Sequence, residues 1–425
     1  MYTKKGRDSD RATLLGTHVA RRVVAVVLGV LALGAAPASG QGLPSQLNAI
    51  IRPAGARAAA YVIDATSGTQ VFAANAESRK APASVEKVYT TSTALRRYGA
   101  DGTLDTTVVS DGSIAGGVLS GNLVLKGGGD PTFGSRAFSQ RTYGNDASVE
   151  ALAAQVRAAG VQRVQGNVLG DESAWDGRRG VPDSGLGRVD AYVGPLSALS
   201  FDRDLTPGGG RYVLKPAAYA AGKLLAALKA QGIAVSGSAA AGTAPSGAKQ
   251  LAKVSSPPMG TLVGLTNRPS DNYLAESLVK GLGAHFGGTG STAGGANVVK
   301  ATIAGDGAHP AVVDGSGLSR RDQTTPHDIV RVLDGVRNDA AGAAFRASLP
   351  VAGRSGTLRT RMRGTSAAGR CQAKTGTLSN VSSLAGYCQA ADGHDVVFAL
   401  LMNNVPLGTA HAEQDQFAAA LVRLG

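Results

Sequence analysis

The chain has 425 residues and a formal net charge of +13 at pH 7, with 43% hydrophobic and 4% aromatic residues. This length exceeds one typical domain, so a core domain with an appended or inserted module is expected. The composition is apolar enough to bury a core and shows no internal repeat, which excludes a disordered chain and a repeat array.

Residues 1–38 predict an export signal. Six basic residues come first, then an apolar run from Val23 to Leu33, and Ala36-Pro37-Ala38 provides a cleavage site. The apolar run is shorter than the roughly 20 residues that a spanning helix needs, so cleavage near Ala38 is favoured over an uncleaved anchor. Contact with the membrane would then be transient, through the signal segment only. Arg21-Arg22 leaves twin-arginine export open as an alternative to the general route.

The charge of the mature chain gives a further indication. Six basic and two acidic residues lie within residues 1–38, so cleavage would lower the formal net charge from +13 to +9. For an exported protein this favours attraction to an anionic cell-wall polymer over nucleic acid. A basic surface that serves only solubility is the alternative. The expected location is periplasmic or otherwise extracytoplasmic, in association with the cell wall.

The first expected elements are a hairpin and a helix. Residues 58–64 and 70–74 are short apolar stretches joined through Thr66-Ser67-Gly68, which predicts two antiparallel strands. The stretch that begins at Ser84 carries apolar side chains at helical spacing and stops at Gly99, which predicts a helix between them.

Residues 104–255 differ in pattern, because short strand-like pieces are broken there by glycine and aspartate. This predicts a separate inserted module of strands and helices. Within it we expect helices near residues 149–159 and 216–231, a strand at 232–240 and a loop at 241–249.

Long helical patterns return from Leu251 onward, beginning with the helix that follows Ser270. The last third of the chain adds strands at residues 371–378 and 396–402 and a final helix at 412–424. The main domain is therefore expected to be discontinuous in sequence. It would comprise residues 42–103 and 256–425, with 104–255 as the insert.

Ser84-Val85-Glu86-Lys87 brings a hydroxyl and an amine to the start of the first predicted helix. Residues three apart share a helix face, so the Lys87 amine can reach the Ser84 hydroxyl, and a helix N-terminus favours negative charge there. The pattern alone is weak, because Ser246 to Lys249 and Ser277 to Lys280 match it too. A helix cap followed by a surface lysine is the ordinary explanation of such a match. The positions of two further motifs single out Ser84.

The second motif, Ser270-Asp271-Asn272, stands at a loop-to-helix junction. A hydroxyl and an amide there can relay a proton and hold a peptide carbonyl, or merely cap the helix. The third, Lys374-Thr375-Gly376-Thr377, lies on a predicted strand, where Gly376 has no side chain to obstruct a substrate backbone. A protective lysine on an edge strand is the alternative explanation.

This order of motifs is the signature of an acyl-enzyme serine hydrolase acting on penicillins or D-alanyl peptides. The motifs provide the base, the proton route and the oxyanion site that an unassisted serine lacks. The chain resembles the penicillin-binding D-alanyl-D-alanine carboxypeptidase/endopeptidases of the peptidase S13 (low-molecular-mass class C) family. Beyond the motifs, the resemblance rests on residues 121–133, 166–177, 194–202, 313–326 and 373–387.

The resemblance implies an α+β fold. It is a penicillin-recognising serine hydrolase domain of the β-lactamase/transpeptidase type, with an antiparallel sheet flanked by helices and a large module inserted between the first two motifs. The 186 residues that separate Ser84 from Ser270 leave room for that module. The stretch after residue 202 passes quickly to the next helix, so the insert is expected to be shorter than in family members with a full third domain.

The resemblance also implies the chemical steps. Ser84 attacks the carbonyl of the penultimate D-alanine, and Lys87 is the base for this step. Ser270 and Lys374 belong to the proton network, and Asn272 holds the substrate or Lys87. Lys374 and the low-dielectric cleft are expected to lower the pKa of Lys87, which must be neutral to act as a base.

The substrate-binding residues follow in the same way. The N–H groups of Ser84 and Thr377 form the oxyanion hole. Thr375 and Thr377 receive the terminal carboxylate of the peptide, and Gly376 lets its backbone approach. The expected partners are a peptidoglycan stem peptide as substrate and β-lactam antibiotics as inhibitors, with no nucleic acid.

Matching blocks place Asp171 and Arg320 where the family reads the side-chain end of the stem-peptide diaminoacid, with Trp175 as a wall. An aspartate suits the amine of that terminus, and an arginine fork suits its carboxylate. A surface aspartate and a helix-cap arginine are the alternative.

Cys371 and Cys388 are the only cysteines of the chain and are expected to form a disulfide. An even cysteine count in an exported chain favours a bridge over free thiols. If Ser379-Asn380 is the tip of a two-residue hairpin, residue 371 lies opposite 388. Opposed Cβ atoms are then about 4.5–5.5 Å apart, which a small adjustment makes close enough to bond.

No metal or cofactor is expected, because the six histidines are scattered without ligand spacing. A D,D-endopeptidase that cuts peptide cross-links would use the same residues and is the main alternative. A β-lactamase is disfavoured by the large insert and by the lack of a recognisable deacylating glutamate motif. A non-catalytic wall-binding or penicillin-sensing module is disfavoured because all three motifs are intact.

Overall fold

The main sheet is assembled from strands near the two ends of the chain. In the computed structural model, which describes residues 42–206 and 208–423, five antiparallel strands lie in the order β12, β13, β14, β1, β2. Their bounds are Cys371–Leu378 (β12), Val381–Gln389 (β13), Asp395–Asn403 (β14), Ala58–Asp64 (β1) and Gln70–Ala74 (β2). The strands expected in these regions are confirmed.

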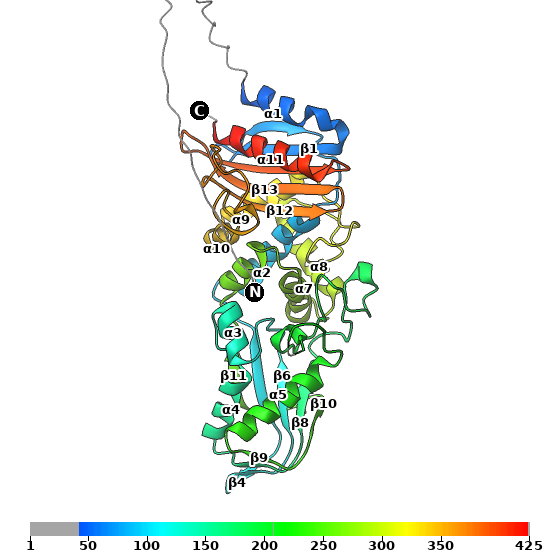
Figure 1. Ribbon diagram of the computed structural model, residues 1–425, viewed down its shortest axis with the longest axis vertical. Coiled ribbons are helices and arrows are strands. Elements are labelled where there is room, and N and C mark those ends of the chain that lie inside the picture. Colours follow the sequence, from blue (N-terminus) through cyan, green and yellow to red (C-terminus); the bar gives the residue numbers. More distant parts are fainter. Residues whose placement is uncertain (1–41, 207, 424–425) are drawn as a thin grey trace, which may run out of the picture. The chain divides into compact units, whose positions relative to one another are not determined.

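Helices cover both faces of this sheet (Figure 1). Helices α1 (Leu43–Ile51) and α11 (Leu407–Val422) pack together on one face, and α9 (Pro326–Arg337) lies on the other. Successive residues of β14 point alternately into these two layers, so its segment from residue 396 to 402 is buried throughout. This is the expected α+β architecture.

Helix α11 is longer than expected. It begins at Leu407, directly after Pro406, and not at residue 412. The added first turn places Ala410 in the apolar layer between α11 and the sheet. Burial of this turn therefore extends the helix beyond the part that the sequence pattern predicts.

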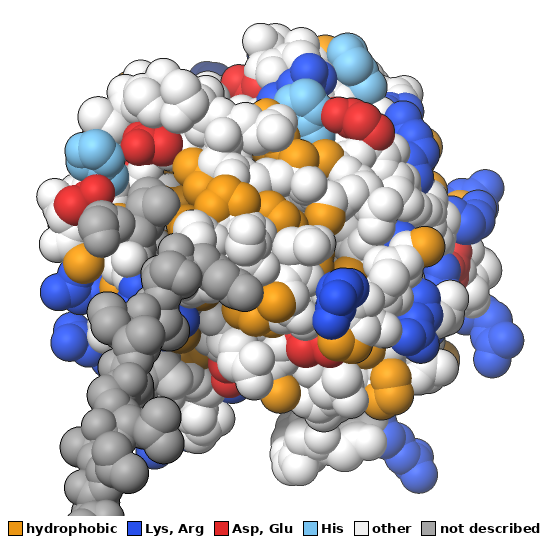
Figure 2. Space-filling model, turned by 90° about the horizontal axis from the view of Figure 1, so that it is seen from above, with side chains coloured by type: hydrophobic (Ala, Val, Ile, Leu, Met, Phe, Trp, Pro, Cys, Tyr) orange, Lys and Arg blue, Asp and Glu red, His pale blue; other side chains and the backbone are white. Residues whose placement is uncertain are grey.

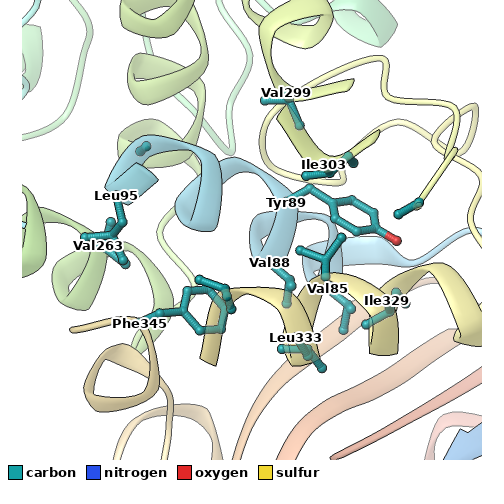
Figure 3. Close-up of a cluster of buried hydrophobic side chains, with 14 of the residues drawn as sticks. Val85, Val88, Tyr89, Leu95, Val263, Val299, Ile303, Ile329, Leu333 and Phe345 are labelled. Carbon is teal, nitrogen blue, oxygen red and sulfur yellow. The ribbon is translucent and has the colours of Figure 1, made fainter. Parts of the chain in front are cut away.

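The first motif begins a helix that runs through the second layer. A 3-10 turn, η2 (Ala83–Glu86), leads into α2 (Lys87–Tyr98), which ends at Gly99 as expected. Figure 3 shows its apolar side chains in one cluster with those of α8, α9 and α10. Every residue from 87 to 95 is buried, so the helix is held on all sides. The other helices of this layer are α6 (Met259–Asn267), α7 (Asn272–Phe286), α8 (Thr292–Ile303) and α10 (Gly342–Ser348).

Residues 104–255 form two further sheets. The larger has the order β10, β8, β6, β3, β11, and the smaller has the order β4, β5, β7, β9. Their bounds are Asp105–Ser110 (β3), Ile114–Ala115 (β4), Val118–Leu119 (β5), Leu123–Gly127 (β6), Arg163–Val164 (β7), Val168–Asp171 (β8), Ala234–Val235 (β9), Ala239–Ala241 (β10) and Lys249–Ser255 (β11). The helices of this segment are α3 (Arg136–Tyr143), α4 (Val149–Ala158) and α5 (Pro216–Ala230), and α4 and α5 share an apolar core with the larger sheet.

One expectation for this segment is wrong. Residues 232–240 form two short strands and not one, because β9 and β10 join different sheets and Gly237 lies between them against the carbonyl of Gly166. The distant pairing partners decide these elements, and they are not visible in the local pattern. The insert ends in strand β11, which pairs with β3.

The predicted export signal at residues 1–38 lies outside the described residues. Within residues 42–206 and 208–423, no helix is long and apolar enough to cross a membrane. Figure 2 shows the face seen from above, with apolar side chains near its centre and lysine and arginine side chains toward its margins.

Strand β12, which carries the third motif, is braced by a disulfide at the predicted register. Leu378 lies opposite Val381 across a two-residue turn, and Cys371 lies opposite Cys388. The two cysteines are bonded, with their Cα atoms 4.1 Å apart. The bridge therefore ties β12 to β13 seven residues before the turn that follows the third motif.

Alkylation of the denatured, unreduced protein should label neither cysteine, and both should be labelled after reduction. Two labelled thiols before reduction would refute the bridge. Because the sequence separation of the cysteines is 17, replacement of both by serine should lower the free energy of unfolding by up to roughly 3 kcal/mol. A urea titration measures this difference.

Candidate active site

The side chain of Lys87 is the meeting point of three separate parts of the chain. Its Nζ lies 3.0 Å from Ser84 Oγ, 2.7 Å from Asn272 Oδ1 and 2.7 Å from the carbonyl oxygen of Ser316. Lys87 is fully buried, whereas Ser84 is partly exposed. The amine therefore lies behind the hydroxyl, on the side away from solvent, and the structure brings the first two motifs together.

The partners of Lys87 determine where its hydrogens go. The carbonyl-type oxygens of Asn272 and Ser316 only accept hydrogen bonds. A neutral amine has two hydrogens, so both go to these oxygens and the lone pair is left for the Ser84 hydroxyl, which can donate. Asn272 Nδ2 lies 3.4 Å from the carbonyl oxygen of Tyr192 and donates to it, which keeps the Asn272 oxygen turned toward Lys87.

Burial affects both lysines of the site. Burial lowers the pKa of Lys87 to about 8, although four nearby carboxyl groups oppose this lowering. These are Asp314, Glu276, Asp271 and Glu86. Burial and the positive charge of Lys87 hold the pKa of Lys374 well below its ordinary value. The expected lowering of the Lys87 pKa by the low-dielectric cleft is therefore found, with burial as its largest cause.

Lys374 joins the third motif to the second. Its Nζ lies 2.8 Å from Ser270 Oγ and 2.7 Å from the carbonyl oxygen of Thr375. Ser270 has a φ of 63°, a left-handed value that a residue other than glycine keeps only where its surroundings impose it. The second motif is thus held in a strained backbone conformation directly beside Lys374.

Gly376 lets strand β12 lie against the turn that carries Ser84. A Cβ on Gly376 would lie 2.4 Å from the carbonyl oxygen of Pro82 and 3.1 Å from the backbone nitrogen of Ser84. No larger residue fits without moving one of these segments. This close contact, which the sequence interpretation did not foresee, brings the next residue of β12, Thr377, beside the Ser84 backbone.

The third motif also lies on a partly open edge of the sheet. Strand β12 is the edge strand, and Ala373 N donates to the carbonyl of Pro350 at 2.9 Å. Among the described residues, no strand pairs with this edge beyond Ala373. Thr377 is exposed, whereas Thr375 is buried with its Oγ1 2.7 Å from Thr357 Oγ1. An extended peptide can therefore add to the edge beside Thr377.

The loop that supplies the Ser316 carbonyl was missed by sequence reasoning. Buried carboxyl groups hold it, since Glu276 Oε1 accepts the N–H groups of Gly315 and Ser316 and Asp314 Oδ1 accepts those of Ser316 and Gly317. Gly317 has a φ of 79°, and a Cβ there would lie 1.9 Å from the carbonyl oxygen of the residue before Ser84. The pair of glycines around one serine, directly after an aspartate, is the signal in the sequence that could identify this loop.

The inserted module reaches the second motif through Arg203. Its two terminal guanidinium nitrogens each lie 2.8 Å from an oxygen of Asp271, and its Cζ lies 4.5 Å from the ring centroid of Tyr273. Asp271 also accepts the N–H of Leu274 at 3.0 Å and so caps α7. The ion pair therefore positions the start of the helix from which Asn272 contacts Lys87.

Arg203 is presented by an unusual turn. The residues of the 3-10 turn η4 (Asp202–Asp204) have φ values of 51°, 57° and 54°. Each such residue costs on the order of 1–3 kcal/mol. Three in succession indicate that the surrounding structure imposes this turn. No local sequence pattern predicts it, because Arg203 and Asp271 are 68 residues apart.

Asp171 lies in the insert, as the last residue of β8. Its carboxylate accepts the N–H groups of Ser173 at 2.8 Å and Ala244 at 2.9 Å, within the insert. Asp171 is only 2% exposed. Both carboxylate oxygens are thus engaged by backbone amides of the insert, and a role of Asp171 toward the amine of a substrate stays a prediction.

Trp175 and Arg320 differ in exposure to solvent. Trp175 is buried, with its ring against Gly129 and Gly290, and it lines a pocket of about 370 Å³ with Asp171 to which none of the three motifs contributes. Arg320 is exposed and donates to the carbonyl of Ser379, in the turn that follows Thr377. Of the three residues expected to read the diaminoacid, Arg320 alone lies beside the catalytic strand.

The two other serine–lysine pairs are not arranged for catalysis. Ser277 and Lys280 lie within α7, both about 1% exposed, and Lys280 Nζ pairs with Asp176 Oδ1 at 2.5 Å. Ser246 and Lys249 are both exposed, in a loop and at the start of β11. Burial and partners thus separate Ser84 from the two sequence matches.

Replacement of Arg203 by methionine should slow acylation of Ser84 by benzylpenicillin on the order of 10- to 100-fold, because a small displacement of Asn272 disturbs the Lys87 geometry. Arg203→Lys keeps the charge but loses the paired contact, so it should recover part of the rate. Stopped-flow acylation rates and Tm are measured together.

The matched control is Arg136→Met, which removes an exposed ion pair with Asp146 in the same insert. It should leave the acylation rate unchanged. If Arg203→Met lowers Tm but acylates at the wild-type rate, the role of Arg203 is limited to stability.

Comparisons with known proteins show the family to which the chain belongs. The model of the D-Ala-D-Ala carboxypeptidase 3 (S13) family matches residues 44–209 and 203–424. The chain is 29% identical to a D-alanyl-D-alanine carboxypeptidase of Actinomadura sp. (strain R39), over 96% of this chain and 91% of that protein. It is 32% identical to the carboxypeptidase DacB of Mycolicibacterium smegmatis, over 86% of this chain and 80% of that protein.

Solved structures show the same fold. Penicillin binding protein 4 (dacB) from Haemophilus influenzae has a TM-score of 0.74 at 21% identity, over 88% of this chain and 98% of that chain. The peptidoglycan endopeptidase Bd3459 from Bdellovibrio bacteriovorus has a TM-score of 0.53 at 17% identity, over 84% and 90%. Because the family model matches both parts of the chain that carry the motifs, the protein belongs to the D-Ala-D-Ala carboxypeptidase 3 (S13) family.

Proposed function

We propose that the protein is a serine D-alanyl-D-alanine carboxypeptidase that shortens peptidoglycan stem peptides through an acyl-enzyme on Ser84 and is inhibited by β-lactams. One observation carries the proposal. Lys87 Nζ lies 3.0 Å from Ser84 Oγ, and its two other partners only accept hydrogen bonds. A neutral amine held in this way has its lone pair free for the proton of Ser84.

Acylation begins when Ser84 Oγ attacks the carbonyl carbon of the penultimate D-alanine and its proton passes to Lys87. The peptide C–N bond then breaks, and the nitrogen of the departing D-alanine must gain one proton. The proton taken up by Lys87 supplies it, through the network that Ser270 and Lys374 form. The product is an ester between Ser84 and the shortened peptide.

The N–H groups of Ser84 and Thr377 are proposed to bind the oxyanion of the tetrahedral intermediate. The close contact of Gly376 with the Ser84 backbone supports this role, because it brings both amides to one side of the nucleophile. Each such donor stabilises the transition state by roughly 3–4 kcal/mol.

Water completes the reaction. It adds to the ester carbonyl, one of its protons returns to Ser84 Oγ as the ester bond breaks, and the shortened peptide leaves as an acid. With a β-lactam the same attack opens the ring, but no group departs, so the adduct remains in the site. This difference explains why one serine serves both as catalyst and as the point of inhibition.

Substrate recognition is proposed to use the open edge of β12. The hydroxyls of Thr375 and Thr377, with Lys374 nearby, receive the terminal carboxylate, and Gly376 admits the peptide backbone. Arg320, exposed beside the turn after Thr377, is proposed to bind the carboxylate of the diaminoacid side chain. Asp171 and Trp175 are left out of this proposal because both are buried elsewhere.

Cutting of D-alanyl cross-links by the same residues is the alternative reaction. The leaving group would then be a second peptide in place of free D-alanine. The likeness to Bd3459 concerns the fold alone, so the distinction rests on the products. Release of the chain to the extracytoplasmic space, after cleavage near Ala38, is part of the proposal, since the substrate is found there.

Intact-mass analysis after exposure to benzylpenicillin should show one adduct on the wild-type protein and none on Ser84→Ala. Release of D-alanine from a pentapeptide and cleavage of a cross-linked dimer should both fall below detection in Ser84→Ala, because removal of the nucleophile costs about 10⁴-fold or more. Ser277→Ala and Ser246→Ala are matched controls and should acylate normally. An adduct that persists in Ser84→Ala, or that maps to either control serine, contradicts the assignment.

The acylation rate should rise with pH and level off above about pH 8. The neutral amine is the active form of Lys87, and its fraction grows about tenfold per pH unit below a pKa of about 8. Stopped-flow rates between pH 6 and 9 test this, and Lys87→Ala should lose both the rise and most of the rate. A flat profile, or a rate that falls over this range, would exclude Lys87 as the base.

A further inference from the structure

One segment of the chain contributes a large share of its net positive charge. Residues 340–391 contain no aspartate or glutamate, yet they carry six arginines and one lysine. Arg346 and Arg361 pair with Asp395 and Asp415 from outside this stretch. The lysine is Lys374 of the active site, so the remaining arginines are an excess that neither pairing nor catalysis uses.

Arg354, Arg359 and Arg363 form the part of this excess that we name the arginine patch. All three are exposed, and none forms an ion pair within residues 42–206 and 208–423. Arg363 Nε donates to the carbonyl of Arg359 at 2.9 Å. Two glycines pack against the other side chains. The Arg354 guanidinium lies against Gly369, where a Cβ would meet it, and Arg363 lies against Gly353, whose Cβ would be 3.6 Å from Arg363 Cγ. The three side chains therefore belong to one small area.

The arginine patch adjoins the catalytic strand. Thr357, within the same segment, contacts Thr375 of the third motif through their hydroxyls. Its N–H donates at 3.1 Å to the carbonyl of Arg268, an exposed arginine two residues before Ser270. The patch thus stands next to the second and third motifs, beside the open edge of β12.

We infer that the arginine patch binds the carboxylates of stem peptides that neighbour the one being cut on the same peptidoglycan strand. This inference rests on the proposed function, because it takes the stem peptide as substrate. A guanidinium presents paired N–H groups that match the two oxygens of a carboxylate. Every stem that ends in D-alanine carries a terminal carboxylate, so one strand repeats the anion that the patch requires.

The small binding energy of a single exposed ion pair favours a polymer over a single peptide as the ligand. One exposed ion pair changes a binding constant by less than about fivefold. Contacts made by one tethered strand combine, because the second and third binding steps are intramolecular. The patch therefore holds the enzyme on a strand with several uncut stems and has little effect on a soluble peptide with one stem.

The test compares two triple variants that remove the same charge. Arg354→Gln/Arg359→Gln/Arg363→Gln removes the patch. Arg157→Gln/Arg163→Gln/Lys229→Gln is the control, because these residues are exposed and lie in the insert, away from the three motifs. Both are placed in a Ser84→Ala background to prevent turnover. Co-sedimentation is measured with purified peptidoglycan free of phosphate polymers, with the same glycan after enzymatic removal of its stems, and with vesicles of anionic phospholipid.

The expected result is an affinity for intact peptidoglycan that falls about tenfold in the patch variant and stays unchanged in the control. The parent protein should not bind the stem-free glycan or the vesicles. Equal binding of patch variant and parent, equal loss in the control, or binding of the parent to stem-free glycan or vesicles would each overturn the inference.

Hydrolysis of a soluble pentapeptide separates this inference from the proposed function. With Ser84 present, the patch variant should release D-alanine at the wild-type rate. If the wild-type protein releases none, the proposed function fails. If it does and the patch variant still binds peptidoglycan like the parent, the inference about the patch fails alone.

Discussion

The arrangement of this protein depends on keeping one lysine amine out of water while leaving it able to exchange a proton with a serine. Burial favours the neutral form of Lys87, and two acceptors bind the hydrogens of that form. A buried polar group without such partners would be strongly unfavourable. Because the partners come from η2, from α7 and from the loop at Ser316, the fold has to close three distant segments around a single nitrogen.

The acidic groups around Lys87 are compatible with a neutral amine because burial acts on them as well. Burial and the charge of Asp314 raise the pKa of Glu276 to about 8 and hold that of Glu86 well above its ordinary value. Glu276 still accepts two backbone N–H groups and so holds the Ser316 loop. These carboxyl groups therefore position the loop without fully opposing the loss of the proton from Lys87.

The inserted module is part of the site's support as well as an addition to the sheet domain. It contacts α7 through two cationic pairs, Arg203 with Asp271 at the start of the helix and Asp176 with Lys280 farther along it. Lys280 is 1% exposed, and its Nζ also donates to the carbonyl of Arg178. Helix α7 carries Asn272 and Glu276. A change in how the insert packs against α7 would therefore displace Asn272 and the loop at Ser316, which contact Lys87.

The motif residues illustrate how far local sequence goes. Ser84, Lys87 and Lys374 could be selected from the sequence because each motif has a fixed spacing on one helix or strand, and the order of the motifs rejects the matches at Ser246 and Ser277. The register of Cys371 and Cys388 followed from a two-residue turn for the same reason, since pairing across a hairpin is local.

Other features depend on contacts between residues that are far apart in the chain, and only the tertiary structure decided them. The carboxylate of Asp171 accepts the backbone N–H of Ala244, 73 residues away, and no local pattern predicts this contact. The partners of Arg203 and of the Ser316 carbonyl lie 68 and 229 residues away, so the sequence does not show what either group contacts. The sequence by itself therefore determined which residues form the three motifs and which cysteines face each other across the hairpin. The closing of the fold determined which distant groups hold them, since hydrogen bonds and burial act between neighbours in space and leave no fixed spacing in the chain.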